Sequence, residues 1–226
     1  MKKIAILAAL ALAAGLGAQV ATKANAGYQT PEDRQKVAKT LADPKRDQQQ
    51  RPGQLMAQMG LKPGMTVADI GTGVGHLLPF LSKRAGDQGH VIAEDIFDDF
   101  LSAAKQLVSE QKLANVTFVK GEEADPKLPE GQVDMALCFD VYHHFNYPEK
   151  MLAGIYKGLR PDGKLVVVEY YKRPTAMPNG MAVTHIRLDM PDLIKELEAN
   201  RFHLVEELER IRDVEYMLIL DKATPQ

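Results

Sequence analysis

The sequence has very little cysteine and no excess of charge of one sign. Cys138 is the single cysteine among 226 residues, so no disulfide can form within the chain. It lies in the apolar run 135–139, where we expect a small buried thiol and not a reactive one. Lysine and arginine number 28 against 30 acidic residues, which lacks the basic excess typical of nucleic-acid-binding proteins. We therefore expect no nucleic-acid partner.

Repeats and low-complexity tracts are also lacking, and the apolar segments predict one doubly wound α/β domain. The predicted strands cover 66–70, 90–96, 115–120, 133–139 and 163–169, and the predicted helices 30–41, 52–59, 76–84, 97–112, 148–159 and 190–199. These strands are nearly continuous apolar runs, as in a mainly parallel sheet with helices on both faces. Two further segments, 202–209 and 213–220, predict an antiparallel C-terminal hairpin at the sheet edge.

The N-terminus has the pattern of a secretory signal. Lys2 and Lys3 precede an apolar run over 4–20, and Ala24 and Ala26 are the small residues that a signal peptidase reads. An uncleaved anchor is the alternative, because the run approaches the ~20 residues of a membrane-spanning helix. Both interpretations place the domain in the periplasm or outside the cell, with no membrane contact beyond the leader. The chain is thus predicted to divide into a signal (1–26), an N-terminal helical segment (27–60) and an α/β domain (61–226). The helical segment is interpreted as a lid on the strength of the family resemblance described below, with plain packing against the domain as the alternative.

The stretch around which the rest is organised runs from Thr66 to His76. An apolar strand ends near Asp69 and breaks into glycines at 71, 73 and 75, with a helix predicted to follow. Such a strand, turn and helix N-terminus is where open α/β sheets bind nucleotide-like ligands, because glycines allow positive φ and close approach of the ligand. A dinucleotide fingerprint needs a third glycine where His76 stands, so pyrophosphate is disfavoured.

The motif Asp-x-Gly-x-Gly-x-Gly resembles the first motif of class I S-adenosylmethionine-dependent methyltransferases. The resemblance extends over 61–220 and implies their seven-stranded, Rossmann-like fold and S-adenosylmethionine as cofactor. It also implies which residues bind the cofactor: Asp69, Gly71, Gly73 and Gly75 in the first loop, Asp95 and Ile96 after the second strand, Glu122, Glu123 and Ala124 after the third, and Asp140 after the fourth. We favour Asp95 over Glu94 as the ribose acceptor. Acids at neighbouring strand ends suit a positively charged sulfonium better than a phosphate-bearing ligand.

The segment 140–147 follows the fourth strand and, in this family, faces the methyl group and its acceptor. His143 or His144 could accept a proton from the acceptor, and Tyr142 could line the methyl pocket. Packing and capping by the two histidines is the alternative. Asp140, His143 and His144 lack a diagnostic metal-site spacing, so we expect methyl transfer without a metal.

The segment 170–181, with His185 and Arg187, is predicted to be a loop on the substrate side. Lys172, Arg173 and Arg187 could bind an anionic acceptor, or they could form a solvated rim. We expect a methyltransferase that acts on a small molecule. The rival hypothesis is an exported binding protein that has no catalytic activity but retains the ligand-binding crevice at the strand ends. It arises because S-adenosylmethionine is a cytoplasmic metabolite. An NAD-linked oxidoreductase is disfavoured by His76.

Overall fold

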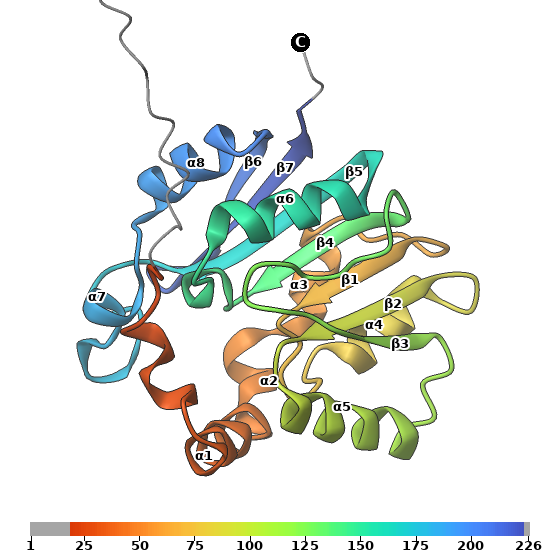
Figure 1. Ribbon diagram of the computed structural model, residues 1–226, viewed down its shortest axis with the longest axis horizontal. Coiled ribbons are helices and arrows are strands. Elements are labelled where there is room, and N and C mark those ends of the chain that lie inside the picture. The colour runs from red at the N-terminus through yellow and green to blue at the C-terminus, as the bar shows by residue number, and fades with distance from the viewer. Residues whose placement is uncertain (1–18, 224–226) are drawn as a thin grey trace, which may run out of the picture.

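The computed structural model describes residues 19–223, and this part of the chain folds around one seven-stranded sheet (Figure 1). Its strands are β1 (Thr66–Ile70), β2 (His90–Asp95), β3 (Val116–Lys120), β4 (Val133–Phe139), β5 (Leu159–Tyr170), β6 (Phe202–Ile211) and β7 (Glu215–Lys222). Their order is β3-β2-β1-β4-β5-β7-β6, with β1 to β5 parallel and β7 antiparallel to both neighbours. The predicted doubly wound sheet with a C-terminal antiparallel hairpin is confirmed.

Helices cover both faces of the sheet. They are α1 (Pro31–Leu41), α2 (Lys45–Gln50), α3 (Pro52–Gln58), α4 (Leu78–Ala85), α5 (Asp98–Glu110), α6 (Pro148–Gly158), α7 (Ala182–His185) and α8 (Met190–Ala199), with 3-10 turns η1 (Ala24–Tyr28), η2 (Tyr142–His144) and η3 (Pro178–Gly180). Figure 1 shows α6 and α8 on one face and α3, α4 and α5 on the other. The strands alternate between the two cores: in β1, Val67 packs with α4 and Ala68 with the α6 side.

Three short elements differ from the sequence-based expectation. The polar segment 45–50 forms α2, and η1 and α7 form in segments for which the sequence predicts no helix. The helix expected from His76 begins only at Leu78, because Thr72 to Leu77 form the turn that follows β1. Cys138 is fully buried, as predicted, and burial raises the pKa of its thiol well above the usual value.

The predicted leader falls mostly on residues 1–18, outside the described residues. Its expected cleavage site, between Ala26 and Gly27, lies within η1, whose Ala24 is buried. Among the helices of residues 19–223, none has both the length and the apolar character needed to cross a bilayer.

Candidate active site

A cavity of about 710 Å³ lies at the carboxyl ends of β1, β2 and β4. Helices α1 and α7 lie at this end of the sheet (Figure 1). Ten of the residues predicted for the site line this cavity: Asp69, Gly71, Gly73, Asp95, Ile96, Glu122, Glu123, Asp140, His143 and His144. The crossover from the β1-β2-β3 half of the sheet to the β4-β5 half creates the crevice, as in other open α/β folds.

The loop after β1 has the left-handed backbone that its glycines predict. Gly71 has φ +67° and Gly73 φ +57°, values that L side chains adopt rarely and with strain. At Gly71 a side chain is also excluded sterically, because a Cβ would overlap Cγ2 of Val141 from the loop after β4. The absence of side chains therefore leaves bare main chain facing the cavity at the point where two strand-end loops meet.

Two adjacent carboxylates at the end of β2 hold this loop. Asp95 accepts hydrogen bonds from the Gly73 N–H (2.9 Å) and the Phe97 N–H (2.9 Å). Glu94 accepts one from the Gly71 N–H (3.2 Å) through Oε2, while its buried Oε1 has no partner within the described residues. Both side chains line the cavity, so Glu94 joins the predicted Asp95 at the site. Burial raises the pKa of Asp95 to about 6 and that of Glu94 well above its usual value.

Two further acids complete an acidic wall. Asp69 accepts a hydrogen bond from the Thr72 hydroxyl (2.7 Å), and burial raises its pKa to about 7. Asp140 has a left-handed backbone (φ +55°) and donates its N–H to the Val168 carbonyl (2.9 Å). Burial, followed by the nearby Glu169, raises the pKa of Asp140 well above its usual value. Burial therefore disfavours ionisation of these carboxyl groups, and Arg46, which also lines the cavity, opposes this effect at Asp69 and Asp140.

The two adjacent histidines of η2, which also line the cavity, are held by partners from distant segments. His143 Nδ1 lies 2.9 Å from each carboxylate oxygen of Glu169, which is the penultimate residue of β5. His144 Nδ1 lies 2.7 Å from Oδ1 of Asn25 in η1. Burial lowers the pKa of His143 to about 3 and that of His144 well below its usual value, so both imidazoles are neutral. His185 of α7 stacks edge-on to both rings.

Residues of the N-terminal helices line the cavity as well. The ring of Tyr28 lies 4.8 Å from that of His144 and 6.0 Å from that of Phe97, which flanks β2. Arg34 of α1 forms an ion pair with Asp99 (2.7 Å) on α5. The segment predicted to form a lid thus contacts both sides of the cavity through described side chains.

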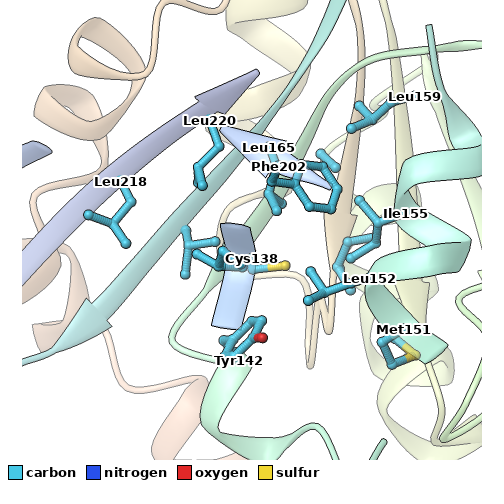
Figure 2. Close-up of a cluster of buried hydrophobic side chains, with 14 of the residues drawn as sticks. Cys138, Tyr142, Met151, Leu152, Ile155, Leu159, Leu165, Phe202, Leu218 and Leu220 are labelled. Carbon is cyan, nitrogen blue, oxygen red and sulfur yellow. The ribbon is translucent and has the colours of Figure 1, made fainter. Parts of the chain in front are cut away.

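Three predicted site residues do not line the cavity. Tyr142 belongs to the same buried cluster as Cys138 and Leu152 (Figure 2), and its hydroxyl donates to Glu196 (2.7 Å). The 3-10 geometry of η2 turns this side chain away from the methyl pocket expected for it. Gly75 instead allows close packing, because a Cβ there would lie 3.2 Å from the Cβ of Ala104 on α5.

Ala124 is the third predicted site residue that does not line the cavity. It lies in the tight turn that pairs Glu122 with Asp125.

The basic residues near the predicted substrate loop do not line the cavity either. Lys172 donates to the Arg187 carbonyl (2.8 Å) and Arg173 pairs with Asp213 (2.9 Å). Arg187 pairs with Glu196 in a bidentate arrangement. The structure therefore favours the rim interpretation over an anion site. Met177, Met181 and His185 are the residues that this part of the chain supplies to the cavity.

Comparison with known proteins identifies the family. Residues 61–218 match the model of a methyltransferase domain family. The chain belongs to this family. A C-methyltransferase of ubiquinone and menaquinone biosynthesis, UbiE from Vibrio campbellii, is 30% identical over 114 residues, which are 50% of this chain and 44% of the relative. The chain spans about half the length of the curated relatives it matches.

Solved structures agree with the class I methyltransferase fold. An S-adenosylmethionine-dependent methyltransferase from Aquifex aeolicus superposes with a TM-score of 0.76 at 28% identity, covering 83% of this chain and 98% of that chain. The [4+2]-cyclase SpnF superposes with a TM-score of 0.64 at 18% identity, covering 77% and 82%. A cyclase on the same fold means that the fold alone does not fix the reaction.

Proposed function

We propose that the protein transfers a methyl group to a small molecule, with S-adenosylmethionine as the methyl donor. The observation that carries this proposal is the acidic wall of the cavity, where Glu94 has a buried carboxylate oxygen without a partner among the described residues, beside the bare backbone of Gly71. Family membership and the Aquifex aeolicus structure support the same activity.

The residues of the cavity fit this cofactor. S-adenosylmethionine, when bound, supplies a methyl group activated on a positively charged sulfonium. The carboxyl groups of Asp69, Glu94 and Asp95 can accept hydrogen bonds and offset positive charge, and the glycine loop leaves room against the main chain. Tyr28 and Phe97 add aromatic surface to the same cavity. A volume of about 710 Å³ lies within the range of small-ligand sites, roughly 300–1,000 Å³.

We propose that the acceptor binds on the side of His143 and His144. These side chains line the cavity together with Met177 and Met181. The name of the Vibrio campbellii relative makes phenols and hydroquinones the first acceptor class to examine. Alignment of acceptor and methyl group in a dry cavity accounts for much of the rate of such a transfer.

Calorimetry followed by an acceptor screen tests the function. The full chain is titrated with S-adenosylmethionine and then incubated with panels of phenols, hydroquinones, thiols and amines, with formation of S-adenosylhomocysteine as the readout. Micromolar binding with turnover on any panel supports the proposal. Binding without turnover on every panel favours the non-catalytic binding protein, and the absence of binding to a folded sample contradicts both.

We also propose that the domain works outside the cytoplasm, on the strength of the leader-like pattern in residues 1–26. Cleavage between Ala26 and Gly27 would remove Asn25, the partner of His144. Cell fractionation and sequencing of the mature N-terminus test this proposal. A cytoplasmic protein with an intact N-terminus would contradict it.

A further inference from the structure

Three histidines from two separate segments meet at the acceptor side of the cavity. His143 and His144 come from η2 and His185 from α7, and their ring centroids lie 4.2, 4.8 and 5.3 Å apart. One ring nitrogen from each lies within 4.8 Å of the others. A tetrahedral zinc ion with Zn–N bonds of about 2.0–2.1 Å holds its nitrogens roughly 3.4 Å apart. Small rotations of the three rings would bring their nitrogen atoms to this separation. The ring of His185 is only half-buried.

The hydrogen bonds behind the rings are those of metal-binding histidines. Nδ1 of His143 lies 2.9 Å from both carboxyl oxygens of Glu169, and the side-chain oxygen of Asn25 accepts a hydrogen bond from Nδ1 of His144. Both partners hold their ring through Nδ1, which leaves Nε2 of each ring available to a metal. Within residues 19–223, neither Nε2 atom has a hydrogen-bond partner.

A second set of ligand atoms, from Asp140, His143 and Glu169, lies equally close together. It is the weaker choice, because both oxygens of Glu169 already contact His143 Nδ1. The three-histidine set leaves this contact intact.

We propose that His143, His144 and His185 bind a divalent transition metal, with Zn²⁺ as the first candidate. An all-imidazole set suits Zn²⁺, Cu²⁺, Fe²⁺ or Ni²⁺ and does not suit Mg²⁺ or Ca²⁺. Three protein ligands would leave a fourth position open, as in catalytic zinc sites, and all three histidines line the cavity. An oxygen or sulfur atom of the acceptor bound there would lose its proton more easily. This assignment replaces the metal-free site expected from the sequence.

Metal binding by the full chain tests the assignment without the cofactor, so its outcome is independent of the proposed function. Protein without a histidine tag is stripped with a chelator and titrated with Zn²⁺ by calorimetry, and then with Co²⁺ while its visible absorption is recorded. We expect one equivalent of either metal to bind. His185→Ala should weaken Zn²⁺ binding at least about 100-fold, and Glu169→Gln about 10- to 100-fold.

Two controls make the result decisive. His203→Ala removes an exposed histidine of β6 and should leave Zn²⁺ affinity unchanged. His185→Gln keeps much of the side-chain volume, so it serves if the alanine variant fails to fold, as judged by urea denaturation. Stoichiometric binding lost in the His185 and Glu169 variants but kept in His203→Ala supports the site. No stoichiometric binding by the wild type, or equal affinity in the His185 variant and the wild type, overturns it.

Discussion

The two sides of the cavity are built in different ways. Most of the proposed cofactor side comes from the segment between β1 and the end of β2, in which neighbouring carboxyl groups hold the backbone of Gly71 and Gly73, and Asp140 is added from the loop after β4. The acceptor side is assembled from η1, η2, β5 and α7, and Asn25 and His144 are 119 positions apart. The first side is a local backbone motif, and the second depends on the completed fold.

The chemistry of the two sides differs as well. Burial raises the pKa values of Asp69 and Asp95 on the cofactor side and lowers the pKa value of His143 on the acceptor side. Burial thus favours the uncharged form on both sides: the carboxyl groups of Asp69 and Asp95 ionise only as the pH rises through about 6 to 7, and the imidazole of His143 stays neutral with a free nitrogen lone pair.

Gly71→Ala should disrupt the glycine loop after β1. Among the variants considered, it should have the largest effect on stability and on cofactor binding. The new Cβ would overlap Val141 and require an unfavourable positive φ, so we expect a loss of about 2–5 kcal/mol in unfolding free energy and no measurable cofactor binding. Urea denaturation and calorimetry measure the two effects.

Gly60→Ala is the matched control for this change, because Gly60 also has a positive φ (+76°) but open space around its Cβ position. The Gly60→Ala variant should lose only the unfolding free energy that a positive φ costs an L residue, about 1–2 kcal/mol. Equal losses in the two variants would show that the Val141 contact is unimportant.

Asp95→Asn sharpens the comparison by removing charge from the cofactor side. The amide keeps the shape but loses one acceptor for the Gly73 and Phe97 N–H groups, so S-adenosylmethionine affinity should fall by about 1–3 kcal/mol. Asp98→Asn is the control, since Asp98 lies nearby in an exposed position at the start of α5. An unchanged cofactor affinity in Asp95→Asn would remove Asp95 from the site.

Affinity for S-adenosylmethionine should rise with pH. Asp95 and Asp69 have pKa values of about 6 and about 7, so raising the pH ionises both groups and favours a bound cation. We expect a gain of roughly five- to tenfold between about pH 5.5 and about pH 8, measured by calorimetry. S-adenosylhomocysteine has no sulfonium charge and should show a smaller change. The same pH dependence for both ligands would contradict the role of these carboxylates.

Tyr142→Phe should have the smallest effect and tests whether the acceptor side includes this residue. Its hydroxyl bonds to Glu196 in the core, so the variant should lose about 1 kcal/mol of stability and keep its cofactor affinity and turnover. A large fall in turnover with unchanged stability would restore Tyr142 to the methyl pocket.

Much of the fold can be predicted because its signals are local. The strand at 133–139 and the helix at 190–199 match β4 and α8 residue for residue, since apolar runs and helical spacing directly reflect burial. The sequence does not reveal α2, because Lys-Arg-Asp-Gln-Gln-Gln has no apolar periodicity. η1 and α7 are too short for periodicity to identify them.

The residues of the candidate site also differ in whether local sequence signals predict them. Gly71 and Asp95 can be predicted because their spacing along the chain fixes their geometry. Glu169 is recognisable in the sequence only as the last residue of a buried strand, and nothing there links Asn25 to a histidine more than a hundred positions away. Such pairs follow from the register of β4 with β5 and from the path of the N-terminal segment, which a single sequence does not determine.

The methyl group of Val141 occupies the space that a side chain at residue 71 would fill. The glycine loop after β1 and the loop that carries the histidines are therefore packed directly against each other. The size of the side chain at either position 71 or position 141 thus limits how closely these two loops can approach.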